Sequence, residues 1–475
     1  MTGYITGEPR TQSTLFLEAL DDYIHEDNPV RVVDVFVDEL NLSELGFNRT
    51  IPSMTGRPGY SPTTMLKLYL YGYLNRIQSS RRLERESQRN VELMWLTQRL
   101  TPDFKTIADF RKDNGPGIKN ACSTFIALCR KLNMFTDAVV AVDGSKFKAV
   151  NSTDRNYTQT NIKRRIEKAE QHIEHYMAQL DEADKDERSE TKESIKSKIT
   201  RLKKHLTKLE SINSEIKEGS VRQVSLTDPD CRLMKTSSIG RTVGYNVQTA
   251  VDTKHHMIVA HYVTNTVSDR NQICEIGKQA QAALDQQKIT VIADKGYYSG
   301  QDIKEAQDEG MLPIVPKTQT SGNRKKGLFT KDDFIYDAEK DIYICPANKE
   351  IPYSFITNDK GKMNRGYISV LTCRDCSIRS QCTTSKARRV WRWEHEARLE
   401  QMEEKLQSMP NIMNVRKSTV EHPFGTIKSW MGATHFLTKR LPNVSTEISL
   451  HVLAYNMKRM MKIIGQPALI EAMRG

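Results

Sequence analysis

Three acidic residues stand in order along the 475-residue chain at places where they could share a site. Asp143 ends the apolar run VAVD, and Asp294 ends a second run, VIAD. Both runs are typical of buried strands, and sites in open α/β sheets form beyond the carboxyl ends of strands. Glu421 follows in TVEHPFGTIK, which is typical of a helix start with Pro423 in its first turn. Each aspartate alone is more often a turn former or helix cap, but the ordered set favours a shared site.

The chemistry that suits three carboxylates is metal-dependent phosphodiester cleavage. Magnesium is a hard cation that prefers oxygen ligands. Two such ions about 4 Å apart activate a water or a 3′-hydroxyl and stabilise the leaving oxygen of an in-line displacement. We therefore expect Asp143, Asp294 and Glu421 to be catalytic and to bind two Mg²⁺ or Mn²⁺ ions. This requires the strands that carry the two aspartates to be neighbours.

A second group of candidate metal ligands lies between Asp294 and Glu421. It consists of half of the eight cysteines: Cys345, Cys373, Cys376 and Cys382. The Cys-x2-Cys spacing is that of a metal knuckle, and four thiolates suit a tetrahedral structural zinc. The wide first gap differs from a standard zinc finger, so an unmetallated cluster is the alternative.

Cations and aromatic residues alternate after these cysteines, in Arg388, Arg389, Trp391 and Trp393. Arginines interleaved with aromatic rings favour a contact with DNA, in which rings stack on bases. The alternative is that both tryptophans are structural. A further arginine cluster, between Arg76 and Arg89, also suits DNA contact, unless Glu84 and Glu86 balance it on a solvated face.

The elements that position these residues fall into four parts. Residues 1–135 have apolar residues at helical spacing, from a first run that begins at Leu15, and predict a helical, DNA-binding N-terminal domain. Within it, Ser61 followed by Pro62 is typical of a helix start. Residues 136–320 and 410–475 predict an α/β core, with three strands, a helix, a strand, a helix, a strand and a final helix around Glu421. Residues 158–220 predict an antiparallel helical hairpin, and residues 321–409 a Cys-rich, basic insert.

Two other aspartates of the predicted core have structural explanations. A hairpin turn at Thr253–His256 explains Asp252, and a helix N-cap explains Asp269. We therefore assign neither of them to the candidate site.

The charge distribution favours a polyanionic partner. The formal net charge is +12, and residues 411–475 carry nine Lys/Arg against three Asp/Glu. Nucleic acid is the first choice of partner and an anionic membrane surface the second. No run approaches the ~18 apolar residues of a membrane span, and the N-terminus lacks a secretory signal pattern. We expect a cytoplasmic, nucleoid-associated protein.

The predicted hairpin differs from the rest in charge. Its residues 161–219 carry 14 Lys/Arg against 13 Asp/Glu, which makes it a poor phosphate binder. Its two apolar stripes must pack on each other, on the core or on a second subunit. We expect a structural or dimerising role and no chemistry.

The motifs around the three carboxylates resemble those of bacterial insertion-sequence transposases of the DDE superfamily. The shared patterns are Asp-Gly-Ser/Thr-Lys at Asp143–Lys146, Ala-Asp-x-Gly-Tyr at Ala293–Tyr297 and Glu-His-x-Phe-Gly-x-x-Lys at Glu421–Lys428. A Gly-Arg-Pro-x-Tyr loop at Gly56–Tyr60 extends the resemblance to the N-terminal domain. The resemblance implies a ribonuclease H-like core, DNA contacts from Arg57 and Lys146, and a homodimer on double-stranded DNA.

One part of the family pattern is altered. Related transposases carry Tyr, Arg, Glu and Lys where this chain has Asn414, Lys417, Glu421 and Lys428. Lysine keeps the charge of arginine but loses its bidentate phosphate geometry. The spacing predicts that one helix face presents Lys417, Glu421 and Lys428 to DNA.

The leading interpretation is a transposase that binds terminal inverted repeats, cleaves the ends and joins the 3′-hydroxyls to target DNA. A nuclease of the same fold without strand transfer is the second interpretation. A DNA-binding regulator with a decayed site is the third, and the presence of all three carboxylates argues against it.

Overall fold

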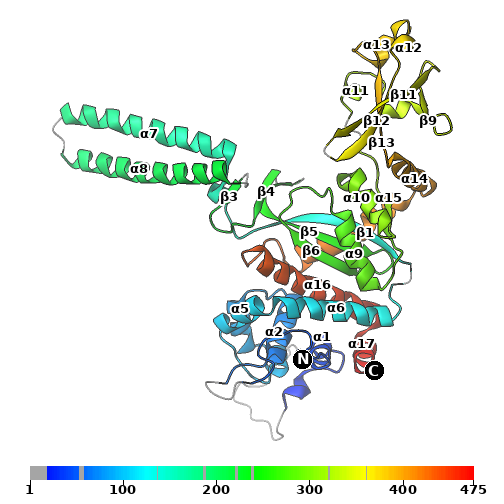
Figure 1. The fold of residues 1–475 in the computed structure, drawn as a ribbon. Coiled ribbons are helices and arrows are strands. Elements are labelled where there is room, and N and C mark those ends of the chain that lie inside the picture. The colour runs from blue at the N-terminus through cyan, green and yellow to red at the C-terminus, as the bar shows by residue number, and fades with distance from the viewer. Residues whose placement is uncertain are drawn as a thin grey trace, which may run out of the picture.

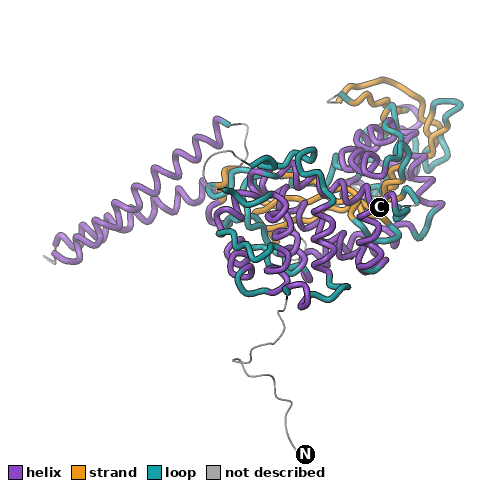
Figure 2. The backbone as a smooth tube through the Cα atoms, turned by 90° about the horizontal axis from the view of Figure 1, so that it is seen from below, coloured by secondary structure: helices purple, strands orange, loops and turns teal. Residues whose placement is uncertain are grey.

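The structure is a computed structural model and describes residues 19–52, 58–135, 137–185, 189–219, 223–236, 240–318, 321–359 and 361–475. It is a mixed α/β protein with a helical N-terminal region, as Figure 1 shows. Figure 2 shows the same chain from below, with strands between the helices and a long helical arm to one side. None of the helices in these described ranges is both long and apolar enough to cross a membrane.

Helices dominate the N-terminal region. They are α1 (Pro29–Asp38), α2 (Pro62–Leu74), α3 (Ser80–Ser87), α4 (Val91–Leu96), α5 (Phe104–Asp113) and α6 (Gly115–Lys131). At the start of α2 the Ser61 side chain accepts a hydrogen bond from the Thr63 N–H, and Pro62 occupies the first turn, which confirms the predicted start signal. The predicted helix from Leu15 begins outside the described residues, and its end is the short 3-10 helix Leu20–Tyr23.

A six-stranded sheet forms the centre of the molecule. Its strands are β1 (Val139–Lys148), β4 (Arg232–Thr236), β5 (Gly240–Asp252), β6 (Ile258–Thr264), β7 (Thr290–Ile292) and β8 (Leu312–Ile314). Antiparallel β5 lies on one side of β1 and parallel β7 on the other, and β8 follows β7. Strands β6 and β4 both pair with β5, along different parts of it. The predicted order of strands and helices is confirmed, with β4 as an unpredicted addition.

Helices cover this sheet. Helix α15 (Ile412–Gly425) packs on β1, β5 and β7, while α9 (Ile273–Leu284) and α16 (Leu441–Ile464) pack on β6. Helix α16 also packs on α2, α5 and α6, so it joins the sheet to the N-terminal helices (Figure 1). A single apolar core therefore runs from the N-terminal helices through the sheet.

The hairpin consists of α7 (Gln159–Lys185) and α8 (Ser189–Glu218), which extend away from the body of the protein (Figure 1). At its base β2 (Asn156–Thr158) pairs with β3 (Gln223–Ser225). Its inner residues form a buried cluster of their own, which includes Ile162, Ala169 and Leu209. Of the three packing alternatives for the apolar stripes, the described residues favour packing on each other.

The Cys-rich region contains a second sheet and follows β8. Its strands are β9 (Ile335–Asp337), β10 (Ile342–Ile344), β11 (Glu350–Asp359), β12 (Lys362–Ile368) and β13 (Arg389–Trp393), paired in sequence order. Tyr343, Tyr367 and Val390 belong to its separate small core. Helix α14 (Glu396–Ser408) then packs on α10 (Gly300–Asp308) and β8, which attaches this region to the central sheet.

Candidate active site

Two of the three predicted carboxylates come from neighbouring parallel strands. The β1–β7 pairing ends at Ala141 opposite Ile292. Asp143 and Asp294 each follow two residues later, at the same end of the sheet. The prediction that their strands are neighbours is confirmed. Asp143 does not end its strand, however, because β1 continues to Lys148 through its pairing with β5.

The Asp143 carboxylate is partly buried and faces a cation from α15. Arg416 Nη2 donates to Asp143 Oδ1 at 2.6 Å, with 12% and 28% of the two side chains exposed. Burial raises the pKa of Asp143, and the Arg416 guanidinium opposes that rise. The negative charges of Asp294 and Asp269 raise this pKa further. Asp294 and Asp269 therefore both lie within electrostatic reach of Asp143, and Arg416 is the counter-charge that Asp143 contacts.

Asp294 occupies a tight turn. Its Oδ1 accepts a hydrogen bond from the Gly296 N–H at 2.8 Å, which caps the 3-10 helix Lys295–Tyr297. Tyr297 in the same turn is 1% exposed. Burial, and then the charges of nearby aspartates, hold the pKa of Tyr297 well above its usual value. Its hydroxyl is therefore protonated and can act as a hydrogen-bond donor.

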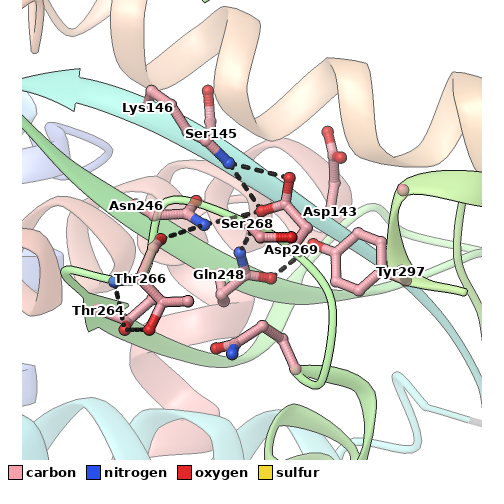
Figure 3. Close-up of polar contacts among 12 residues, drawn as sticks. Asp143, Ser145, Lys146, Asn246, Gln248, Thr264, Thr266, Ser268, Asp269 and Tyr297 are labelled. Carbon is pink, nitrogen blue, oxygen red and sulfur yellow. Dashed lines mark hydrogen bonds and ion pairs between the residues drawn. The ribbon is translucent and has the colours of Figure 1, made fainter. Parts of the chain in front are cut away.

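Asp269 lies at the centre of a polar network, shown in Figure 3. Lys146 Nζ donates to its two carboxylate oxygens at 2.7 and 2.9 Å. The amide groups of Asn246 and Gln248 donate to its Oδ1 at 2.7 and 2.9 Å. The prediction that Asp269 caps a helix is wrong, because the residue at the N-cap position of α9 is Gln272.

The two sides of β1 have different partners because successive side chains of a strand point to opposite faces. Asp143 and Ser145 meet the cations of Arg416 and Lys428. Lys146 points to the other face and contacts Asp269. The ammonium group that we expected to contact DNA is thus held in an ion pair, with 12% of the Lys146 side chain exposed.

Glu421 lies in the second half of α15 and not at a helix start. The helix begins at Ile412, and Pro423 is inside it. Proline lacks an N–H and disturbs the preceding turn, and the chain continues as a π-helix over Thr426–Trp430. Glu421 and Lys417 are both exposed, one turn apart.

Lys428 departs from the predicted common helix face because it lies in the π-helical turn. Its Nζ donates to Ser145 Oγ at 2.6 Å and to the Lys146 carbonyl at 3.1 Å. It also lies 4.5 Å from the centre of the Phe147 ring. Burial lowers the pKa of Lys428, and the negative charge of Asp143 opposes this decrease. Lys428 thus anchors the end of α15 to β1.

Sequence reasoning missed Arg416. Because the family pattern places a cation four residues before the glutamate, Lys417 was the predicted flanking residue. Helical spacing offered a signal, since Arg416 lies on the same side of α15 as the buried Val420 and Pro423. An arginine on the buried face of a helix needs a counter-charge, and Asp143 provides it.

The carboxylates of Asp143 and Asp294 fit a hard divalent cation in part. They are oxygen ligands at one sheet edge, and the charge of Asp294 raises the pKa of Asp143, a repulsion that a divalent cation relieves. Among the described residues, however, no three His, Cys, Asp or Glu side chains stand close enough to bind one metal ion. Glu421 therefore does not complete this pair in the conformation that the structure describes.

Among the described residues, the four cysteines are likewise not close enough to bind one metal ion, although they surround a common cavity. All four line one cavity of about 20 Å³, together with Phe334 and Arg388. Burial raises the pKa of Cys382, with smaller contributions of the same sign from the other three cysteines. The cavity has room for roughly one water-sized body.

The two tryptophans after the cysteines differ in solvent exposure. Trp393 is 8% exposed and packs into the main core with Leu399 and Met402, so its ring is not available for stacking on a base. Trp391 is 38% exposed, and Arg389 lies over its ring. Arg388 lies over Phe334 beside the cysteines. The structural alternative therefore holds for one tryptophan of the two.

Arg57 lies outside the described residues, so the structure does not place this predicted DNA contact. The five arginines of the predicted cluster are exposed on and beside α3: Arg76, Arg81, Arg82, Arg85 and Arg89. Glu86 pairs with Arg89. Arg76 lies over Trp430, which is 67% exposed and follows Lys428 by two residues.

Comparison with known protein families gives two matches. A transposase domain (DUF772) matches residues 18–113, and a transposase DDE domain matches residues 227–457. Together they cover about two thirds of the chain and include Asp294 and Glu421, whereas Asp143 lies between them. No curated protein matches the chain.

One solved structure is similar to this chain, the cryo-EM structure of a piggyBac transposase synaptic complex with hairpin DNA. The identity is 9% and the TM-score 0.35, over 94% of this chain and 79% of that chain. A likeness of this size carries no argument about fold or function.

Proposed function

The chain belongs to the insertion-sequence transposases of the DDE superfamily, and from this premise we propose that it cleaves the terminal inverted repeats of its element and joins the freed 3′-hydroxyls to target DNA. The observation that carries the proposal is that Asp143 and Asp294 lie at equivalent positions, each two residues beyond the last paired residues of β1 and β7. A carboxylate pair at this edge of a sheet suits metal-dependent phosphodiester chemistry.

The topology of the central sheet supports a ribonuclease H-like core. Strand β5 is antiparallel to both of its neighbours β6 and β1, and β7 and β8 then run parallel to β1. Helices follow β6 and β7, so that each parallel strand is reached through a crossover.

Asp143 and Asp294 are the residues that would hold the divalent metal ions. Bound magnesium or manganese activates the attacking oxygen and neutralises charge on the leaving oxygen. We propose that Glu421 joins the pair when DNA is bound, which requires a shift of α15 around the π-helical turn. Arg416 then loses its role as the counter-charge of Asp143 and is available to a phosphate.

DNA follows the exposed cations on this side of the protein. Lys417 and Glu421 are exposed on α15, and Arg76, which precedes the arginines of α3, lies over the exposed ring of Trp430. Phosphate contacts of this kind position the duplex without reading its sequence. Arg389 and Trp391 provide a second exposed cation–aromatic pair, on the Cys-rich region.

Two further assignments accompany the proposal. One structural zinc is bound by Cys345, Cys373, Cys376 and Cys382, which is supported by their arrangement around one cavity. The working form is a homodimer on DNA, because two ends must be joined together and one active site serves each end.

The test uses purified full-length protein, magnesium and a labelled DNA carrying an end of the element. We expect strand cleavage at the end and its joining to a target plasmid, with Asp143→Asn and Asp294→Asn each abolishing both reactions while DNA affinity remains. Cleavage without joining would indicate the nuclease interpretation. Binding without metal-dependent cleavage would indicate a regulator and overturn the proposal.

A further inference from the structure

We propose that Tyr297, Gln248 and Asp269 form a positioning unit that fixes the turn carrying Asp294 against the strand carrying Asp143. The inference rests on the proposed function, because it assigns these residues to the geometry of the metal-binding carboxylates. None of the three belongs to the predicted catalytic set. Figure 3 shows them together beside Asp143.

The first link joins the turn of Asp294 to β5. The Tyr297 hydroxyl donates to Gln248 Oε1 at 2.5 Å. Tyr297 belongs to the turn that Asp294 caps, and its own N–H donates to the Asp294 carbonyl at 3.1 Å. A shift of the tyrosine ring therefore moves the backbone of Asp294 directly.

The second link joins β5 to β1. Gln248 lies opposite Gly144 in the β1–β5 pair, one residue along from Asp143. The amide nitrogen of Gln248 donates to Asp269, which fixes the orientation of the amide so that its oxygen points to Tyr297. Gln248 is fully buried, so a lost partner would leave an unsatisfied polar group.

The third component is the charge of Asp269. Its Oδ1 accepts from Lys146, Asn246 and Gln248, and the Lys146 ammonium balances its charge. Two rungs of the β1–β5 ladder, Lys146–Asn246 and Gly144–Gln248, are thereby tied to one carboxylate. The network thus holds the register of these strands from the face opposite to Arg416.

Gly144 indicates how closely this unit packs on the strand of Asp143. A Cβ atom at Gly144 would collide with Gln248 Nε2 and Asp269 Oδ1. The glycine that follows the first aspartate is therefore required by the network, and any larger residue would push the amide away from Tyr297.

Tyr297→Phe tests the unit because it removes one hydroxyl and keeps the ring. Tyr262→Phe is a matched control, since the Tyr262 hydroxyl also donates to a glutamine, Gln272 Oε1, at 2.5 Å. Full-length wild-type protein and both variants are compared in Mn²⁺ binding, followed by electron paramagnetic resonance without DNA, and in magnesium-dependent end cleavage.

We expect Tyr297→Phe to weaken Mn²⁺ binding about tenfold and to slow cleavage roughly 10- to 100-fold, because small displacements of reacting groups have large kinetic effects. The Tyr262→Phe variant should match wild-type protein in both measurements. Gln248→Met, which breaks the unit from the β5 side, should reproduce the Tyr297→Phe defects and provides the test if that variant does not fold.

Unchanged Mn²⁺ affinity in folded Tyr297→Phe or Gln248→Met protein would overturn the inference, as would equal defects in Tyr262→Phe. Asp143→Asn separates this outcome from failure of the proposed function. If Asp143→Asn binds Mn²⁺ and cleaves DNA like wild-type protein, the proposed function itself is wrong.

Discussion

The carboxylates of Asp143 and Asp294 are brought together by paired strands, whereas the four cysteines are brought together by short helices and loops. Backbone hydrogen bonds between β1 and β7 fix the register of the two strands, and this register places the two aspartates at equivalent positions independently of their side chains. Cys373 and Cys382 lie in the short helices Val370–Arg374 and Arg379–Cys382, and Cys345 follows β10. Nothing in their local backbone requires them to meet, so their approach depends on packing in a small core.

Strand pairing can thus force like charges together, at an electrostatic cost that neighbouring residues must offset. Around Asp143 this is done by Arg416. Around Asp269 it is done by Lys146 and two amides. The cysteine cavity would need such a balance once a metal is bound, because cysteines bind metal ions as thiolates.

The largest effect is expected from Glu421→Gln, which tests whether a third carboxylate joins the strand-positioned pair. We expect end cleavage to fall by at least about 10³-fold with DNA affinity nearly unchanged, because the carboxylate would help to hold the metal ions that act on the reacting phosphate. Gel assays of cleavage and binding measure both. Glu400→Gln is the control, since the Glu400 carboxylate already accepts two hydrogen bonds from Arg392, at 2.5 and 2.7 Å.

Robust cleavage by Glu421→Gln would show that the third ligand lies elsewhere, with Glu394, Glu396 and Glu400 as the next candidates. Two of these already have cationic partners, Lys331 and Arg392, which argues against them.

Arg416→Met tests the counter-charge of the strand-positioned pair. Removal of one partner from a half-buried ion pair should lower the free energy of unfolding by about 3 kcal/mol. Urea denaturation measures this loss. Magnesium should stabilise the variant more than wild-type protein, because the cation then supplies the missing charge.

The double variant Arg416→Met/Asp143→Asn completes this experiment. It should recover most of the lost stability, since no uncompensated charge remains. A double variant as unstable as Arg416→Met alone would show that the arginine acts through packing and not through Asp143.

Cys373→Ser/Cys376→Ser tests the loop-assembled cluster. Wild-type protein should contain about one equivalent of zinc and the double variant less than half, as measured by elemental analysis. Loss of the metal should destabilise the Cys-rich sheet by about 2 kcal/mol or more. Cys274→Ser, which is remote from the cavity, is the control.

A wild-type protein that contains little zinc and keeps its activity after chelation and restoration of magnesium would refute the zinc assignment. The aspartate pair would then be a metal site, whereas the four cysteines would be a packed thiol cluster without a metal.

The smallest effect is expected from removal of the hairpin, which has neither kind of cluster. Thr158 lies opposite Gln223 in the β2–β3 pair, so an Asn-Gly turn between them should close a β-hairpin in place of α7 and α8. We expect end cleavage within about twofold of the wild-type rate, because the apolar residues of the hairpin pack on each other. Loss of paired-end complexes, measured by mass with DNA bound, would instead assign the hairpin to dimer assembly.

Local patterns in the sequence determined much of the fold. Apolar runs located β1, β5, β6, β7 and β8, and helical spacing with Ser61 and Pro62 located α2. The turn at Asp252 was also predicted, and its carboxylate accepts hydrogen bonds from the Lys254 and His255 N–H groups. These features depend on residues that are close to one another in the sequence, so local sequence patterns are sufficient to predict them.

The tertiary structure decided the residues whose partners lie far away in the chain. Arg416 meets Asp143 across 273 positions, and Lys146 meets Asp269 across 123. A proline that is typical of a helix start lies inside α15, because the packing of Val420 and Phe424 holds the helix on both sides of it. Single-residue preferences contain no information about which distant strand or helix arrives beside them. The assignment of each charged group, to solvent, to a counter-ion or to the site, was therefore fixed only when the sheet and α15 were packed together.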